Sequence, residues 1–197
     1  MHDYPVHNEK AELRSRLLGR RRELSPEWRK TAAEALAGHA VRLAEPGTTV
    51  AAYVSVGGEP GTRPLLEALR ERGVRVLLPV LLPDNDLDWA AYEGPERLAP
   101  AGRGLLEPVG PRLGPEAVCA AALVLLPGLA VDHRGLRLGR GGGSYDRVLA
   151  RLDRAGATPL LVTLLWAHEF LPEVPAEEHD RPVGAVVTPE GVTLIRA

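Results

Sequence analysis

Short runs that are apolar at nearly every position, and not only at alternate ones, constrain the fold of this chain most strongly. Compact examples cover residues 74–78, 122–126 and 159–164. A strand that is apolar on both faces has to be covered on both faces, as strands of a parallel or mixed sheet are. Segments with helical periodicity separate these runs. We therefore expect an α/β fold: one mixed, mostly parallel sheet with helices on both faces.

Apolar stripes and end signals mark the expected helices. Leu13, Leu17 and Leu24 form one stripe of a first helix. Ser25 followed by Pro26 suits the N-cap and the first position of a second helix. We expect helices over residues 8–24, 26–43, 62–72 and 145–155, strands over 48–54, 74–78, 87–92, 122–126 and 159–164, a terminal hairpin of 185–188 with 192–195, and loops over 95–115 and 127–144.

Length and charge limit the organisation and the partners. A chain of 197 residues supports one well-buried core, so we expect residues 1–197 to form a single domain. The net charge of −2 gives no reason to expect a nucleic-acid or membrane partner. The N-terminus has no apolar signal core, no run is long enough to cross a bilayer, and a single cysteine allows no internal disulfide. We expect a cytoplasmic monomer.

A glycine-rich segment, residues 139–145, is the strongest local indication of chemistry. It lies between a predicted buried strand and a predicted helix, and Arg137 and Arg140 accompany it. Glycines let backbone N–H groups approach a phosphate, and a helix N-terminus adds partial positive charge. The segment is not a P-loop, because the chain has no Gly-Lys pair, and Ser144 replaces the last glycine of a dinucleotide fingerprint. On these glycines alone, a flexible turn with solvated arginines remains the alternative.

Further candidates come from other parts of the chain. Lys10 and Arg14 stand four apart on a predicted helix, so both can meet one phosphate, although a solvated basic face is the favoured interpretation for the pair alone. Glu59 follows a predicted strand end, where ligands gather in open α/β sheets. Asp146 and Asp180 are carboxylates that can bind Mg²⁺ beside phosphate oxygens, or can serve as capping or solvated groups.

Together these segments resemble the 5-formyltetrahydrofolate cyclo-ligase family, also called 5,10-methenyltetrahydrofolate synthetases. The resemblance covers nearly the whole chain, and its most specific part is the stretch of residues 126–147. The matching motifs, in order, are Lys10-x-x-Leu13-Arg14 with Arg21-Arg22-Glu23-Leu24-Ser25, then Tyr53 with Glu59 and Thr62, then Glu107-Pro108, then Leu126-Pro127-Gly128 through Gly141-Gly142-Gly143-x-Tyr145-Asp146-Arg147, and finally Pro175 through His179-Asp180.

The resemblance implies an enzyme and its reaction. ATP phosphorylates the formyl oxygen of 5-formyltetrahydrofolate, the N10 nitrogen attacks the activated carbon, and phosphate leaves to give 5,10-methenyltetrahydrofolate. ATP is then a co-substrate and Mg²⁺ the cofactor.

The resemblance also implies roles for individual residues. Those expected to bind ATP are Lys10, Arg14, Arg137, Leu138, Gly139, Arg140, Gly141, Gly142, Gly143, Ser144 and Tyr145. Lys10, Arg140 and Tyr145 are expected to be catalytic. Those expected to contact the folate are Val54, Glu59, Arg140, Gly141, Gly142, Gly143 and Ser144. Asp146 and Asp180 are expected to hold Mg²⁺.

Besides Val80, which stands where an arginine often follows the proline, three positions depart from the family pattern. Ser144 and Trp166 stand where tyrosines are common, and Glu169 stands where glutamine is common. We expect these departures on the substrate side of the site. They define one alternative, a diverged nucleotide-binding relative with another folate substrate or none. A second alternative is a nucleotide-free α/β protein that is structural or binds a sugar phosphate.

Overall fold

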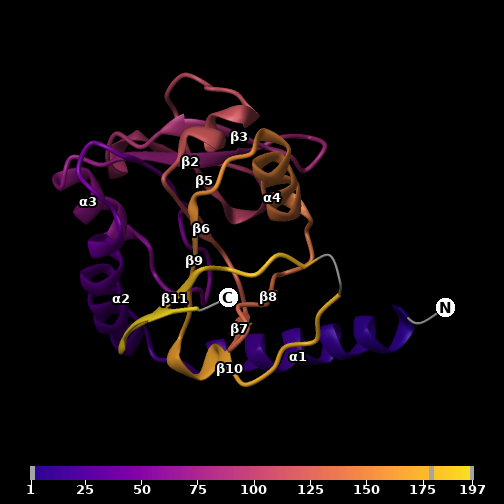
Figure 1. The fold of residues 1–197 in the computed structure, drawn as a ribbon. Helices are drawn as coiled ribbons and strands as arrows, with labels where there is room; N and C mark the ends of the chain where they lie inside the picture. Colours follow the sequence, from indigo (N-terminus) through magenta and orange to yellow (C-terminus); the bar gives the residue numbers. More distant parts are fainter. Residues whose placement is uncertain (1–2, 178–179, 196–197) are drawn as a thin grey trace.

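The computed structural model describes residues 3–177 and 180–195 (Figure 1). Its α-helices are α1 Asp3–Glu23, α2 Pro26–Ala40, α3 Arg63–Glu71 and α4 Ser144–Ala155. Short 3₁₀ helices are η1 Val41–Leu43, η2 Pro95–Arg97, η3 Gly102–Gly104, η4 Pro115–Ala120 and η5 Ala167–Glu169. The strands are β1 Thr49–Ala51, β2 Arg75–Leu81, β3 Leu87–Ala91, β4 Leu98–Pro100, β5 Leu106–Pro108, β6 Leu123–Leu126, β7 Ala130–Asp132, β8 Arg137–Leu138, β9 Leu160–Leu164, β10 Phe170–Leu171, β11 Ala185–Thr188 and β12 Gly191–Leu194.

A seven-stranded sheet forms the centre of the fold, in the order β12-β11-β9-β6-β1-β2-β3. The five inner strands pair in parallel. The edge strands β3 and β12 each run antiparallel to their neighbour. The predicted mixed, mostly parallel sheet is confirmed.

The two faces of this sheet belong to two separate cores, and strand side chains alternate between them. In β6, Leu123 and Leu125 join the core under α2 and α3, while Val124 and Leu126 join the core under α4 and η4. Every β6 side chain is buried, as the continuous apolar run predicts. The prediction of helices on both faces is confirmed, with α2 and α3 on one face and α4 on the other.

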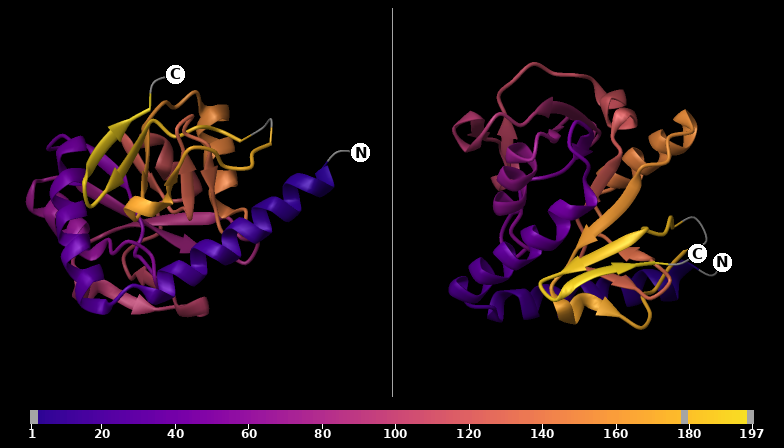
Figure 2. Two further views of the ribbon diagram at one scale, coloured as in Figure 1. Left: turned by 90° about the horizontal axis from the view of Figure 1, so that it is seen from below. Right: turned by 60° about the vertical axis from the view of Figure 1, so that its left-hand side comes forward.

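Helix α1 lies apart from this arrangement. It packs Leu13 and Leu17 on the three-stranded sheet β10-β7-β8, against Leu129, Ala130 and Leu138. Figure 2 shows α1 as a long helix along one side of the molecule, with its N-terminal end extending beyond the rest. Its last turns reach the large core, where Leu24 packs. Among the helices of the described ranges, none combines the length and apolarity needed to cross a membrane.

The structure corrects two loop predictions. Residues 95–115 contain the β4–β5 hairpin as well as η2 and η3, and residues 127–144 contain the β7–β8 hairpin. Strand β10 was not predicted either. These strands are two or three residues long, and Pro100 and Pro108 lie in β4 and β5, so neither periodicity nor propensity indicates them. The predicted α4, β3 and β9 agree with the structure to within a residue at each end, whereas β1 is shorter than expected.

Candidate functional site

A cavity of about 740 Å³ opens where the strands β1 and β6 end at their carboxyl sides. Residues 53–59 follow β1, and Pro127 and Gly128 follow β6. The remaining walls come from α1, from the loop between β8 and α4, from the β2–β3 and β4–β5 hairpins, and from the chain around Asp180. Ligand sites of open α/β sheets lie at such strand ends. The volume falls in the usual range for a small-molecule site.

The structure brings every residue that the sequence assigned to the site into the lining of this one cavity. These are Lys10, Arg14, Val54, Glu59, Arg137, Leu138, Gly139, Arg140, Gly141, Gly142, Gly143, Ser144, Tyr145, Asp146 and Asp180. Their shared location is a finding, whereas their roles toward a ligand remain predictions.

The glycine segment forms the turn between β8 and α4. Gly141 and Gly143 have φ values of +92° and +78°, which residues with a Cβ rarely adopt. Gly143 is the N-cap of α4, and no side chain caps the helix there within the described residues. The first turn of α4 therefore faces the cavity with its N–H groups, the arrangement that binds anions at helix N-termini.

Three arginines surround this turn. Arg14 Nε donates to the Gly139 carbonyl at 2.9 Å, so helix α1 contacts the glycine turn directly. Arg137 is buried, and its Nη1 donates to the Pro127 carbonyl at 2.8 Å. Burial lowers the pKa of Arg137, but an arginine remains charged at any physiological pH. Arg140, at the rim, is half exposed. The turn therefore concentrates positive charge where a phosphate chain would lie.

Lys10 reaches the same cavity from α1 and is largely buried. Its Nζ lies 2.8 Å from Glu177 Oε2 and 3.0 Å from Asp180 Oδ2. Burial opposes the charged form, but the hydrogen bonds to Glu177 and Asp180 outweigh it, and the pKa of Lys10 is raised. Lys10 is therefore a buried ammonium group held between two carboxylates.

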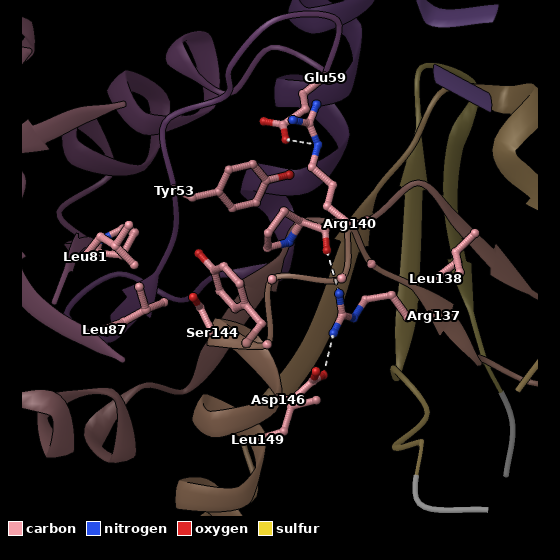
Figure 3. Close-up of a pocket in the computed structure, with 18 of the residues that line it drawn as sticks. Tyr53, Glu59, Leu81, Leu87, Arg137, Leu138, Arg140, Ser144, Asp146 and Leu149 are labelled. Carbon is pink, nitrogen blue, oxygen red and sulfur yellow. Dashed lines mark hydrogen bonds and ion pairs between the residues drawn. The ribbon is translucent and has the colours of Figure 1, made fainter. Parts of the chain in front are cut away.

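Glu59 marks the other end of the cavity. Its Oε2 accepts from the Val56 N–H at 2.8 Å, and its Oε1 lies 3.5 Å from Arg140 Nε (Figure 3). Burial, followed by the charge of Glu59, raises the pKa of Tyr53 and of Tyr145, so both hydroxyls keep their protons near neutral pH. This end thus offers one carboxylate acceptor and two neutral phenols. From the sequence, Tyr53 was recognised only as part of a motif, without a role of its own.

An apolar wall of leucines completes the cavity, and these residues were not predicted from the sequence. The wall consists of Leu81, Leu87, Leu105, Leu106 and Leu149. Two of these, Leu105 and Leu106, belong to the β4–β5 hairpin, which was expected to be loop, so no sequence signal placed them here. A flat, largely apolar ligand can pack against such a wall.

The two predicted metal-binding carboxylates lie in the same lining. Asp146 is exposed, and its Oδ1 lies 3.6 Å from Arg137 Nη2, while Asp180 pairs with Lys10. In the part of the chain that the structure describes, no group of three or more His, Cys, Asp or Glu side chains could hold a metal by itself. Mg²⁺ usually takes one or two carboxylates together with substrate phosphates, so two carboxylates near a phosphate turn fit this ion. His179, in the matching motif, lies outside the described residues.

Two of the three departures from the family pattern lie outside the cavity, contrary to expectation. Trp166 and Glu169 are completely buried, and neither is among the described residues that line the cavity. Glu169 binds Arg21 instead, and Trp166 donates its indole N–H to the Gly58 carbonyl. Of the three, only Ser144 lines the cavity within the described ranges. The expected location of Trp166 and Glu169 was wrong, because position along the chain does not show toward which side of a loop a side chain points.

Comparison with known proteins gives one consistent result. The model of the 5-formyltetrahydrofolate cyclo-ligase family matches residues 6–189. A 5-formyltetrahydrofolate cyclo-ligase of Mycolicibacterium smegmatis is 44% identical over 193 residues, covering 95% of this chain and 97% of that protein. One of Escherichia coli is 35% identical over 148 residues, covering 73% and 79%. The solution structure of Aquifex aeolicus 5,10-methenyltetrahydrofolate synthetase superposes with a TM-score of 0.77 at 29% identity, covering 95% of this chain and 93% of that one.

The family match covers most of the chain, and the cavity described above lies within it. The chain therefore belongs to the 5-formyltetrahydrofolate cyclo-ligase family.

Proposed function

We propose that this protein converts 5-formyltetrahydrofolate to 5,10-methenyltetrahydrofolate, using ATP and Mg²⁺ and releasing ADP and phosphate. Relatives that match nearly the whole chain carry the names of this activity. The observation that carries the proposal is that a cationic glycine turn and an apolar wall with a carboxylate share one cavity. An ATP phosphate chain and a flat folate ring can therefore meet there.

The proposed chemistry has two steps. The formyl oxygen of the substrate is amide-like and is a poor leaving group until it is phosphorylated. In the first step this oxygen attacks the γ-phosphorus of ATP, and ADP departs. The N10 nitrogen then adds to the activated formyl carbon and releases its proton to solvent. The carbon–oxygen bond breaks, and phosphate leaves with that oxygen. Phosphoryl transfer of this kind depends mainly on positioning and on charge neutralisation.

The cations of the cavity serve the first step. Arg14 and Arg137 neutralise the phosphate chain next to the glycine turn, and Lys10 exchanges part of its carboxylate contact for phosphate. Arg140 reaches toward Glu59 from the glycine turn, so it stands between the two proposed ligands. We assign Arg140 to the phosphoryl group in transfer, where a fixed cation lowers the barrier most.

The folate takes the opposite end. Its pterin ring carries N–H donors, and Glu59 is the carboxylate that can accept from them. The ring packs beside Val54 and the leucine wall. The protonated hydroxyl of Tyr145, next to the phosphate turn, donates to an oxygen of the reacting group.

Mg²⁺ fits between the carboxylates of Asp146 and Asp180 and the phosphate oxygens. When bound, it neutralises phosphate charge and orients the chain for transfer. The proposed site draws on residues from Lys10 to Asp180 of a single chain, which supports activity of the whole chain as one domain and as a monomer.

One experiment tests the function. Purified protein with Mg²⁺-ATP and 5-formyltetrahydrofolate should give a rise in the methenyltetrahydrofolate absorbance band that requires ATP. Omission of ATP, or addition of EDTA, is the control. If no rise occurs while calorimetry detects ATP binding, the activity assignment is wrong. Trp166 and Glu169 are not among the described lining residues, so of the three departures only Ser144 supports a relative with an altered folate site.

A further inference from the structure

A buried ion pair joins helix α1 to the chain just after β9. Arg21 and Glu169 have side chains that are 2% and 0% exposed. Arg21 Nε donates to Glu169 Oε1 at 2.6 Å, and Arg21 Nη2 donates to Glu169 Oε2 at 2.9 Å. A bidentate pair of this kind fixes the relative orientation of both groups. The proposed function gives neither residue a role.

The pair also reaches two walls of the cavity. Arg21 Nη2 donates to the Gly128 carbonyl at 2.8 Å. Glu169 Oε2 accepts from the Trp166 backbone N–H at 3.0 Å, and the Trp166 indole donates to the Gly58 carbonyl at 3.0 Å. Gly128 lines the cavity, and Gly58 directly precedes Glu59. One cluster therefore contacts the loops after both β1 and β6.

Close packing leaves these loops little freedom. A Cβ on Gly58 would lie 3.0 Å from Arg21 Cβ. A Cβ on Gly128 would lie 3.0 Å from Thr163 Cγ2 and 3.3 Å from Arg137 Cγ. Gly58 therefore packs directly on Arg21, whereas Gly128 packs on Thr163 and Arg137 and accepts a hydrogen bond from Arg21.

We propose that Arg21, Glu169 and Trp166 form a positioning clamp that sets the Glu59 loop and the Pro127–Gly128 loop against helix α1. The same helix carries Lys10 and Arg14 toward the phosphate turn. The clamp thus fixes the distance between the folate end and the phosphate end of the cavity. The kinetic part of this proposal rests on the proposed function, and the structural part does not.

Trp166→Phe tests the clamp most sharply. It removes the single hydrogen bond to Gly58 and leaves the Arg21–Glu169 pair in place, whereas changes to that pair risk loss of folding. The measurement is hydrogen–deuterium exchange of residues 55–62. The N–H groups of Ser55, Val56, Glu59 and Thr62 are all hydrogen-bonded within this loop. We expect exchange about fivefold faster, the factor that matches loss of one ordinary hydrogen bond.

The second measurement is steady-state kinetics of the same variant. The KM for 5-formyltetrahydrofolate should rise severalfold, while kcat and the KM for ATP stay within about twofold, because Glu59 shifts and the phosphate turn does not. A general loss of packing would not raise the KM for the folate while leaving kcat and the KM for ATP unchanged.

Two controls separate the clamp from other effects. Trp28→Phe alters the ring packing against Trp166, whose centroid lies 5.1 Å away, without touching the Gly58 bond. Tyr92→Phe removes one hydrogen bond, to Glu67 at 2.6 Å, among residues outside the described cavity lining. Both should leave loop exchange and kinetics unchanged.

The outcomes are distinct. Unchanged exchange over residues 55–62 in Trp166→Phe, or equal acceleration in Tyr92→Phe, overturns the clamp. Faster exchange with an unchanged folate KM overturns its role in positioning Glu59. If the wild-type protein shows no cyclo-ligase activity, the proposed function fails, and the exchange comparison alone still decides whether the clamp holds the loop.

Discussion

Arg140 offers the clearest separation of function from stability, because the chain contains a matched control. Arg140 and Arg147 have side chains that are each 49% exposed. Each lies about the same distance from one carboxylate: 3.5 Å from Glu59 for Arg140 and 3.4 Å from Asp84 for Arg147. Arg140 lines the cavity, whereas Arg147 is not among the described lining residues. The partner carboxylates differ, since Glu59 is 9% and Asp84 66% exposed. We expect Arg140→Ala and Arg147→Ala both to have small effects on stability, and only Arg140→Ala to lose activity.

The expected magnitudes follow from these contacts. A half-exposed ion pair contributes about 0.2–1 kcal/mol to folding. A chain of this size loses roughly 2–4 °C in Tm per kcal/mol, so each variant should melt within about 4 °C of wild type. Removal of a cation that stabilises the transferring phosphoryl group costs about 3–4 kcal/mol in the transition state, or a factor of about 10²–10³ in kcat/KM. Arg147→Ala should keep kcat/KM within about twofold.

The assay pairs thermal unfolding, followed by circular dichroism, with methenyltetrahydrofolate formation at varied ATP. Two results would refute the reasoning. One is a loss of activity in Arg147→Ala as large as in Arg140→Ala. The other is a fall in Tm for Arg140→Ala large enough to explain its inactivity.

Three further predictions concern the metal, the buried pair and a glycine. Asp180→Asn should raise the Mg²⁺ concentration needed for half-maximal turnover, and an unchanged requirement in a metal titration would remove Asp180 from the metal site. Arg21→Met should lower the free energy of unfolding, measured in urea, by about 3–5 kcal/mol, because it leaves Glu169 buried without its cation. The double variant Arg21→Met with Glu169→Leu should recover much of that loss. A double variant no more stable than the single one would contradict this prediction. Gly135→Ala should lower the free energy of unfolding by more than about 1 kcal/mol, since Gly135 has φ of +87° and an added Cβ would lie 2.7 Å from a backbone carbonyl oxygen. Gly142→Ala, where an added Cβ meets open space, should lower it less in the same urea titration.

The large sheet could be predicted because its strands carry their own signal. Residues 122–126 are apolar throughout, and residues 159–164 are apolar except for Thr163. The structure buries β6 completely at the centre of the sheet. The small sheet could not, because β8 and β10 have two residues each and depend on helix α1 for their burial. Tertiary packing decides such strands, and no local pattern precedes it.

The site divides in the same way. The glycine turn is a local motif that the sequence alone indicates, whereas Lys10 was assigned to the site only through the family resemblance. The leucine wall required knowledge of two hairpins, and the clamp required contacts between residues far apart. Glu169 illustrates the limit: its buried partner, Arg21, lies 148 positions away. From the sequence, Glu169 could be recognised only as an unusual residue.

Helix α1 has a consequence for the order in which this protein assembles. Helix α1 is synthesised before the strands of the sheet, yet its buried cations Arg21 and Lys10 are neutralised by residues made much later, with separations of 148 positions for Arg21–Glu169 and 170 for Lys10–Asp180. Closing loops of that length is entropically costly and slow. Until Glu169 and Asp180 have emerged, burial of Arg21 and Lys10 would strand two unpaired cations, so the sheet can collapse before α1 docks. We therefore expect the ligand cavity to be completed only after the chain up to Asp180 has been synthesised.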